Sequence, residues 1–449
     1  MSLGSNSSSL SSRIDDLSAR VGVIGLGYVG LPLAHALCEG GFRVLGLDTD
    51  PEKITMLADG TSYLEHLGPD LVTQLASGDK FEATTDFSRM DELDVVVVCV
   101  PTPLGPHREP DLSFVYSAAD SCGATLHAGQ LLILESTTYP GTTRDEFLPR
   151  ILAARKSNGD LQPGRDFFVA YSPEREDPGR PLAEGRKTPR LVGALDSDSA
   201  ALATAFYSKC FPTVINVGRA EIAEASKILE NTFRSVNIAF VNEMKVILEE
   251  MGIDVWEVIE AASTKPFGFM PFYPGPGLGG HCIPVDPFYL SWKAKEVGRP
   301  TRFIELAGSI NQAMPEYVVT RTLHALNAQG VPMKGARVLV LGLAYKPDVN
   351  DTRESPSFEL IQRLIALGAE VDYSDPHLPV MKATRRHDYG LTSVDLTPES
   401  IASFDVLLLA TNHSSFDYDL IAKHARLVVD TRNAFKHHAE AMGERLVRA

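Results

Sequence analysis

The sequence lacks the features that would place it in a membrane, in a disulfide scaffold or on nucleic acid. No run of about 18 apolar residues occurs, so we expect no membrane span. The 5 cysteines include no C-x-x-C pair and no metal-ligand spacing, so no metal site or disulfide framework is expected and a cytoplasmic location is favoured. Acidic residues outnumber basic ones, 58 to 42, and the net charge of −16 disfavours nucleic acid and acidic membranes as main partners.

What is present is the pattern of an α/β protein with two or three domains in 449 residues. Residues 1–19 begin with a stretch rich in serine and glycine and are expected to form a disordered leader. In residues 20–200, strand-like runs alternate with helical patterns, which predicts a parallel sheet. Residues 201–330 are predicted to be a helical central domain with long helices over 221–251 and 300–329, and residues 331–449 return to the alternating pattern. The predicted fold has two Rossmann-like parallel-sheet domains joined by a helical central domain with a long helix.

A glycine-rich turn, residues 25–30 (GLGYVG), follows the first predicted strand and precedes an apolar helix. Gly25 permits a tight turn, Gly27 lets the backbone approach a pyrophosphate, and Gly30 lets helix and strand pack closely. Asp48 ends the next strand, at the spacing of the acid that holds the adenosine ribose, and an acid there disfavours NADP. The pattern predicts an NAD site formed by Gly25, Gly27, Tyr28, Val29, Gly30 and Asp48.

Two nearby features have two readings each. Lys53 either neutralises a cofactor phosphate or is a solvated surface lysine. The turn at residues 100–103, which contains Thr102, follows a strand and lies at the edge where doubly wound folds bind ligands, or it is a simple rigid turn.

The most informative stretch is the loop 275–287 (GPGLGGHCIPVDP). Four glycines within 275–280 are costly in backbone entropy unless something must come close. Cys282 follows them, and Asp286 shares its face if Cys282 opens a helical turn, which would also lower the pKa of the thiol. We predict that Cys282 is a nucleophile, whereas the other four cysteines fall in predicted helices, strands or helix ends and are expected to be inert.

The helix predicted over 221–251 carries Lys227 and Asn231, which lie four residues apart and therefore on one face. A lysine with a neighbouring amide suits an oxyanion site, because the cation stabilises developing negative charge. Taken alone, this pair would more often be a surface feature.

Six blocks together resemble the UDP-glucose/GDP-mannose dehydrogenase family across nearly the whole chain after residue 20. They are 25–33 (GLGYVGLPL), 135–142 (ESTTYPGT), 171–175 (YSPER), 227–231 (KILEN), 279–290 (GGHCIPVDPFYL) and 341–356 (LGLAYKPDVNDTRESP). The resemblance implies a four-electron oxidation of the C6 hydroxyl of a UDP-sugar in two hydride transfers to NAD, through a thiohemiacetal and a thioester on Cys282.

The resemblance also implies roles for individual residues. Lys227 would stabilise the oxyanion, Asn231 would bind the sugar, Asp286 would hold water near the thiol, and Glu174 would be the general base for hydrolysis. The predicted cofactor-binding residues are Ser136, Thr137 and Arg353. Thr137 also stands at the position where the family binds a water molecule. On the substrate side stand Phe272, Tyr273, Gly279 and Lys346, with the C-terminal domain binding UDP. The long central helices would pair two subunits in a homodimer or a higher homo-oligomer.

Two departures from the family pattern bear on the substrate. Pro178 stands where many UDP-glucose enzymes have a second acid, and the segment 174–179 (EREDPG) resembles the N-acetylhexosamine branch instead. Lys265 is the nearest cation to an arginine that some relatives supply from a neighbouring subunit. The loop 272–290 looks most like that of enzymes that oxidise UDP-N-acetylglucosamine for surface polysaccharide, with UDP-N-acetylmannosamine second and UDP-glucose third.

Two other classes remain open. A two-electron hydroxyacid dehydrogenase of the 6-phosphogluconate type shares the glycine turn but needs no thiol, and the NADH formed per sugar separates it from a four-electron enzyme. A non-catalytic nucleotide-binding module would show no turnover at all.

Overall fold

The computed structural model describes residues 5–64, 69–105, 107–155, 160–175, 187–280, 283–381 and 389–449. The chain forms two compact units, Met1–Glu230 with Phe288–Arg299 and Asn231–Pro287 with Pro300–Ala449, and each contains one sheet. The division passes through the long helix α9 (Ala220–Glu250). The predicted fold class is therefore confirmed: parallel sheets occur in both halves of the chain, with a helical region between them in sequence.

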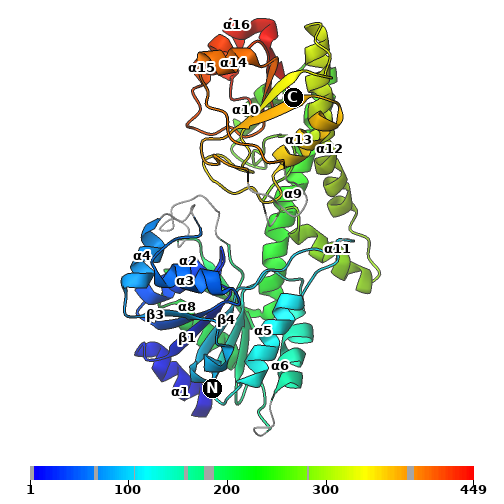
Figure 1. Ribbon diagram of the computed structural model, residues 1–449. Coiled ribbons are helices and arrows are strands. Elements are labelled where there is room, and N and C mark those ends of the chain that lie inside the picture. Colours follow the sequence, from blue (N-terminus) through cyan, green and yellow to red (C-terminus); the bar gives the residue numbers. More distant parts are fainter. Residues whose placement is uncertain are drawn as a thin grey trace. The chain divides into compact units, whose positions relative to one another are not determined.

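The first unit contains an eight-stranded sheet with helices packed on its faces (Figure 1). Its order β3-β2-β1-β4-β5-β6-β7-β8 is parallel throughout except for the antiparallel pair β6–β7. The strands are β1 (Arg20–Ile24), β2 (Arg43–Leu47), β3 (Phe81–Thr84), β4 (Val95–Val98), β5 (Leu131–Leu134), β6 (Phe168–Tyr171), β7 (Arg190–Ala194) and β8 (Val214–Arg219). The helices are α2 (Gly30–Glu39), α3 (Pro51–Ala58), α4 (Pro69–Ser77), α5 (Ser113–Ala124), α6 (Leu148–Ala154), α8 (Ser197–Tyr207) and α11 (Asp286–Glu296), whose first two residues are counted in the second unit.

Apolar runs at residues 20–25, 43–48, 94–100, 131–135 and 167–171 predict five of these strands, whereas β3, β7 and β8 were not predicted. Strands β3 and β8 lie at the two edges of the sheet and have no fully buried residue, so neither shows the apolar run of a central strand. The sheet also continues to Arg219, past the predicted domain boundary at residue 200, which falls inside α8.

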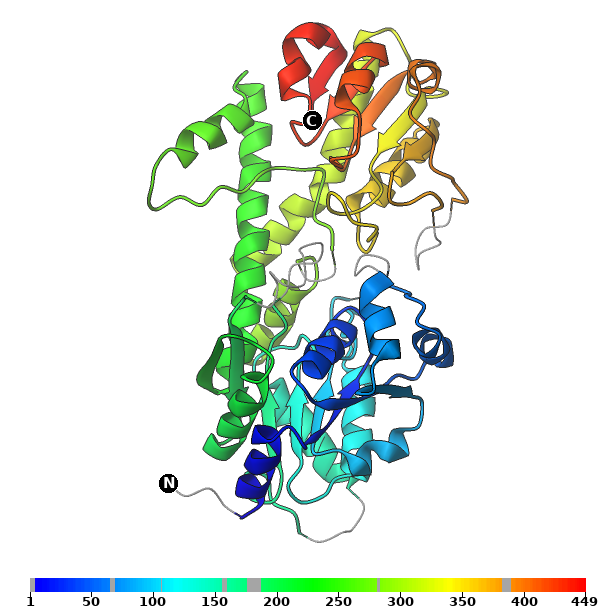
Figure 2. The same ribbon diagram turned by 90° about the vertical axis from the view of Figure 1, so that its left-hand side faces the viewer.

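The expected disordered leader is wrong for residues 5–19. Residues Ser5–Asp15 form helix α1, which packs beside α8 (Figure 2). Leu10 and Ile14, one turn apart, are fully buried in the core of the first unit. Serine is a modest helix former, so composition alone does not reveal this helix, and burial of its two apolar residues against the sheet domain stabilises it.

The second unit contains a five-stranded parallel sheet of order β10-β9-β11-β12-β13. The strands are β9 (Arg337–Leu341), β10 (Glu370–Ser374), β11 (Val406–Leu409), β12 (Val428–Asp430) and β13 (Leu446–Arg448), and all but β13 were predicted. Alternate residues enter two cores: Val338 and Val340 face the side of α12 (Arg302–Ala328) and α13 (Pro356–Ala366), whereas Leu339 and Leu341 face the side of α14 (Pro398–Ser403), α15 (Tyr418–His424) and α16 (Ala439–Met442).

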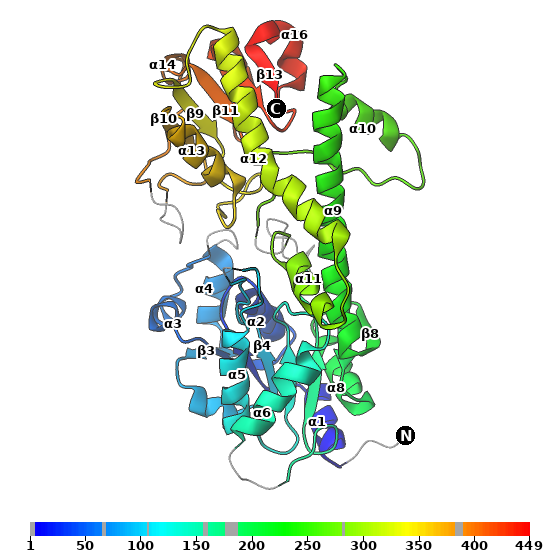
Figure 3. The same cartoon turned by 90° about the vertical axis from the view of Figure 1, so that its right-hand side faces the viewer.

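The helical part of the second unit consists of α9 from residue 231 onward, α10 (Val255–Ser263) and α12 (Figure 3). Buried amides join α9 and α12: Asn242 Nδ2 donates to Asn311 Oδ1 at 2.9 Å, and Asn311 Nδ2 donates to Ser235 O at 3.2 Å. Both long helices agree with their predicted ranges to within a few residues. Among the described helices, none is both long and apolar enough to span a bilayer.

Candidate active site

The glycine-rich turn lies between β1 and α2, and its three glycines meet three different surroundings. Gly25 has φ +90, in the left-handed region that favours glycine. A Cβ on Gly30 would lie 1.8 Å from the Gly25 carbonyl oxygen, so only glycine allows this close packing. A Cβ on Gly27 would meet no atom within 4 Å. The space beside Gly27 and the lack of a side-chain cap on α2 fit the approach of a pyrophosphate to backbone N–H groups.

Asp48 follows β2 and is 7% exposed. Its Oδ2 accepts a hydrogen bond from the Leu26 N–H at 2.9 Å and lies 3.1 Å from Lys53 Nζ. Asp48 therefore ties the end of β2 to the glycine turn, at the place where a ribose-binding acid is expected. Lys53 neutralises Asp48 directly, an interaction that neither predicted reading of this lysine included.

The loops after β4 and β5 are joined at the same edge of the sheet. The Ser136 hydroxyl donates to Val100 O at 2.8 Å, and the Tyr289 hydroxyl, from α11, donates to Thr102 O at 2.5 Å. Thr137 is 9% exposed. The predicted cofactor residues of the first unit thus all follow carboxyl ends of parallel strands, where open α/β sheets bind ligands. Arg353 belongs to the second unit.

Lys227 lies buried on α9 beside a carboxylate of the first unit. Its Nζ is 3.8 Å from Glu174 Oε2, and the two side chains are 7% and 14% exposed. Burial of a lysine costs free energy unless a counter-charge is near, and Glu174 supplies one. Glu230, close by in the sequence, instead pairs with Arg175 at 2.6 Å. The structure therefore joins two predicted catalytic residues and shows that Lys227 is not a surface feature.

Asn231, one turn further along α9, contacts the helix that follows the cysteine loop. Its Nδ2 donates to Asp286 Oδ2 at 2.5 Å, and Asp286 is 2% exposed. Asp286 is the first residue of α11, so the expected helix starts four residues after Cys282. His281 and Cys282 lie outside the described residues.

The glycines before the cysteine pack on the block 341–356. Gly280 N–H donates to Arg353 O at 3.0 Å, and a Cβ on Gly279 would lie 2.5 Å from the Tyr345 Cβ. The second unit thus brings Gly279 close to Tyr345, the neighbour of Lys346 in sequence. The Arg353 guanidinium pairs with Asp351 at 2.6 Å.

Phe272 and Tyr273 contact aromatic residues of the central helices. The ring centroids of Phe272 and Phe233 are 5.7 Å apart, and Tyr273 stacks on Trp256 with centroids 5.6 Å apart. These contacts fasten the start of the loop to α9 and α10. Packing accounts for both residues, and their predicted contact with substrate stays a prediction.

Three family models match the chain in order. They describe the NAD binding domain, the central domain and the UDP binding domain of the UDP-glucose/GDP-mannose dehydrogenase family, and they match residues 19–211, 221–313 and 339–437. The chain belongs to the UDP-glucose/GDP-mannose dehydrogenase family. It is an NAD-dependent UDP-sugar dehydrogenase, so the predicted enzyme class and cofactor are confirmed.

Relatives of this dehydrogenase align over almost their full length. A UDP-N-acetyl-D-glucosamine 6-dehydrogenase from Pseudomonas aeruginosa is 35% identical over 88% of this chain and 91% of its own. A UDP-N-acetyl-D-mannosamine dehydrogenase from Methanococcus maripaludis is 32% identical over 93% and 94%. The solved structure of a UDP-D-ManNAc dehydrogenase from Pyrococcus horikoshii superposes with a TM-score of 0.80 at 31% identity, covering 92% of this chain and 95% of that one.

Three cysteines of the dehydrogenase outside the glycine loop, Cys38, Cys99 and Cys122, are poor nucleophiles. Burial raises the pKa of Cys38 and of Cys122 to about 12. Burial, together with the nearby carboxylate of Glu135, raises the pKa of Cys99 well above its ordinary value. A thiol attacks as the thiolate, so these groups are unsuited to covalent catalysis near neutral pH.

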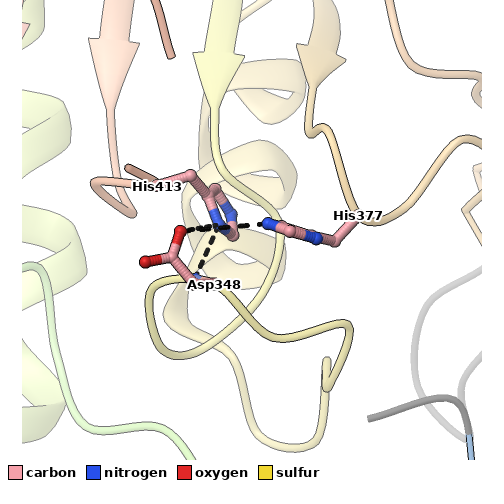
Figure 4. Close-up of side chains that lie close together, drawn as sticks. All are labelled: Asp348, His377 and His413. Carbon is pink, nitrogen blue, oxygen red and sulfur yellow. Dashed lines mark hydrogen bonds and ion pairs between the residues drawn. The ribbon is translucent and has the colours of Figure 1, made fainter. Parts of the chain in front are cut away.

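One cluster in the UDP-binding part of the dehydrogenase has the residue types of a metal site. Asp348, His377 and His413 turn toward one another, with His377 Nε2 and His413 Nδ1 each 3.9 Å from Asp348 Oδ1 (Figure 4). However, His413 Nδ1 accepts the Asp348 N–H at 3.0 Å, and its Nε2 lies 3.0 Å from Asp375 Oδ2. Since both nitrogens of His413 are engaged, the cluster fits a hydrogen-bonded loop anchor better than a metal-ligand set.

Several residues that support the dehydrogenase site were not predicted. Glu224 is fully buried and accepts hydrogen bonds from the Thr143 N–H at 2.8 Å and from the Gly141 N–H. Arg190 forms a buried ion pair with Glu135. Arg190 directly precedes the apolar run 191–195, but its partner Glu135 is far away in the sequence, so no local pattern indicates the pairing.

Proposed function

We propose that the enzyme oxidises the C6 hydroxyl of a UDP-N-acetylhexosamine to the carboxylate in two steps, with Cys282 as covalent nucleophile. UDP-N-acetylglucosamine is the preferred substrate, and UDP-N-acetylmannosamine and UDP-glucose are the alternatives. The product would be a uronate precursor of surface polysaccharide. The relatives named for N-acetylhexosamine substrates at 31–35% identity support the substrate class.

The hydrogen bond between Asn231 and Asp286 carries the proposal. It anchors the first residue after the cysteine loop to the helix that bears Lys227. Both side chains belong to the second unit, and Asp286 lies four residues after Cys282 in sequence. An anchored loop end is what a nucleophile needs if it is to meet a substrate carbon reproducibly.

The chain's own residues then have the following tasks. The alcohol loses a proton from its hydroxyl and a hydride from C6, two electrons in all, to form an aldehyde. The Cys282 thiolate attacks that aldehyde, and protonation of the resulting oxyanion produces a thiohemiacetal. Lys227 stabilises the oxyanion, because a buried cation acts strongly where water is excluded. A second two-electron oxidation produces a thioester. Water held near Asp286 and Thr137 hydrolyses it, Glu174 takes the water proton, and the free thiol returns.

Bound NAD supplies the electron acceptor for both oxidations. We assign its binding to the glycine turn, Asp48, Lys53, Thr102, Ser136 and Thr137. The resemblance to the family adds Arg353 to this assignment. The open space at Gly27 fits this assignment. For the substrate we assign Gly279, which packs against Tyr345, and Lys346, the residue that follows Tyr345 in sequence, together with Asn231, Phe272 and Tyr273.

We further propose that α9 pairs two copies of the chain. Five apolar side chains of α9, together with Met251, which directly follows the helix, are between 46% and 68% exposed. They recur at intervals of seven and four residues, which places them along one stripe: Ile222, Leu229, Phe233, Phe240, Ile247 and Met251. A continuous apolar stripe on one long helix is self-complementary in a two-fold pair.

The cytoplasmic location of the enzyme stays a prediction.

The deciding experiment measures NADH formed per UDP-N-acetylglucosamine consumed. The proposal expects two NADH per sugar and the acid as product, and one NADH would place the enzyme with two-electron hydroxyacid dehydrogenases. Cys282→Ser should stall during or after the first oxidation. Formation of acid at the wild-type rate by this variant would exclude covalent catalysis. Steady-state comparison of the three UDP-sugars tests the preference.

A further inference from the structure

A buried ion pair lies behind the loops that carry Thr137 and Glu174. Arg190 and Glu135 are 5% and 1% exposed, and the Arg190 guanidinium pairs with the Glu135 carboxylate. Arg190 Nε also donates to the Ser172 hydroxyl at 3.0 Å. Burial lowers the pKa of Arg190, but the neighbouring charges, Glu135 foremost, outweigh burial and raise the pKa above its ordinary value. Arg190 is therefore a charged residue that bonds to two different loops.

The sheet register explains why one arginine reaches both loops. Leu134 of β5 pairs with Tyr171 of β6 in parallel register, so Glu135 and Ser172 leave the sheet side by side. Strand β7 runs antiparallel to β6, with Tyr171 opposite Gly193. This reversal puts the start of β7, where Arg190 lies, at the carboxyl ends of β5 and β6. A parallel β7 would carry its first residue to the opposite edge.

The guanidinium is held firmly in its plane. It lies over the rings of Tyr207 and Phe211, with its central carbon 4.8 Å from each centroid. The Tyr207 hydroxyl donates to Glu135 as well. A planar fork bonded on two edges and covered by two rings has little freedom left. The guanidinium therefore keeps the Glu135 carboxylate and the Ser172 hydroxyl at a fixed separation from each other.

Stability alone does not account for this arrangement. Replacing a buried ion pair by apolar residues of similar volume is often neutral or stabilising, because both charges must be desolvated. A requirement that the loops after β5 and β6 keep a fixed separation does account for the buried ion pair. Ser136 and Thr137 directly follow Glu135, and Glu174 is two residues after Ser172. Each of the two side chains that Arg190 bonds to therefore lies within two residues of a residue with a proposed role.

We propose that Arg190 is a positioning residue for the oxidation: by joining Glu135 to Ser172 it sets the separation between the Ser136–Thr137 segment and Glu174. The inference rests on the proposed function, which assigns the cofactor side to Ser136 and Thr137 and the general base to Glu174. Arg190 itself contacts neither substrate nor cofactor in this scheme.

The test uses a variant that removes both charges together, Arg190→Met with Glu135→Gln, in the full-length enzyme. No unpaired buried charge is left, so thermal unfolding should occur at the wild-type temperature or above. We expect kcat to fall by about 10-fold or more, because small displacements of reacting groups are costly. NAD affinity, measured by calorimetry, should change less than kcat.

A matched control is Ser199→Ala. Ser199 is a buried serine that bonds to the Val169 N–H at 3.1 Å, near the start of β6 and away from the carboxyl edge. Its hydroxyl also donates to Asp196 Oδ2 at 2.6 Å. We expect this variant to unfold at a lower temperature while kcat stays within about twofold of the wild type, because the two hydrogen bonds that it removes serve stability alone. A lower kcat with an unchanged unfolding temperature is expected for the double variant, and an unchanged kcat with a lower unfolding temperature for Ser199→Ala. This contrast separates a positioning role from a purely stabilising one.

If the double variant keeps kcat within about twofold of the wild type, the inference is wrong. If the double variant does not fold, Arg190→Lys replaces it: the ammonium keeps the charge but lacks the two-edged fork, and full kcat there would overturn the inference. The NADH count of the wild-type enzyme is independent of these variants. One NADH per sugar would refute the proposed function, whereas two NADH with unchanged variant kcat would refute only the role of Arg190.

Discussion

Replacing Gly27 by alanine isolates the approach of NAD to the glycine turn. A Cβ at this position meets no atom within 4 Å, so the fold should accept the methyl group at little cost. A bound pyrophosphate would occupy that space and would be pushed away. Forcing an extra methyl into a filled site costs about 1–3 kcal/mol. At about 1.4 kcal/mol per tenfold, NAD should bind roughly 5- to 150-fold more weakly.

The assay pairs calorimetric titration of NAD with thermal unfolding of the protein without NAD. Gly27→Ala should change the first and leave the second unchanged. Gly30→Ala is the contrasting variant, because its Cβ would lie 1.8 Å from the Gly25 carbonyl oxygen and must move α2 away from β1. That variant should unfold several degrees lower even without NAD. Wild-type NAD affinity in Gly27→Ala would refute the reasoning, since no pyrophosphate could then lie against this backbone.

Three further predictions concern the nucleophile, its helper and the subunit interface. Lys227→Ala should lower kcat by about 10²–10³-fold, the cost of losing one oxyanion donor, and an effect confined to NAD affinity would contradict that role. Because burial raises the pKa of Cys122 to about 12, only about 1 in 10⁴ of the Cys122 thiols is ionised at pH 8. Iodoacetamide should therefore label Cys282 before Cys122. If mass spectrometry showed the reverse order, the role of Cys282 as nucleophile would be contradicted. If α9 pairs two copies of the chain, as proposed, Phe240→Lys should lower the mass measured by light scattering, whereas Ile365→Lys, at an exposed site on α13, should not. Equal masses for both variants would exclude the α9 stripe as the interface.

Local patterns carried most of the fold prediction. Five of the eight strands in the first sheet and four of the five in the second appear as apolar runs, because central parallel strands are buried on both faces. Helices α9 and α12 show apolar residues at helical spacing, and their observed ends agree with the prediction to within a few residues. The edge strands β3, β8 and β13 were not predicted, because none of their residues is fully buried.

Contacts between distant segments could not be predicted in this way. Helix α1 depends on burial of Leu10 and Ile14 against the sheet domain, and its serine-rich composition pointed to disorder. The ion pair of Arg190 with Glu135 requires β7 to turn back beside β6. Nothing within either short segment signals that reversal.

The sequence by itself determined the two sheet domains, the NAD-binding turn and the residues available for chemistry. Each of these depends on neighbours along the chain: the φ of Gly25, the spacing to Asp48, and the placement of Lys227 and Asn231 on one helical face. Only the tertiary structure decided which partners these groups meet. Lys227 lies beside Glu174 and Asn231 bonds to Asp286 because folding brings together segments that are far apart in sequence. Burial then makes such pairings necessary, since a charge removed from water needs a partner.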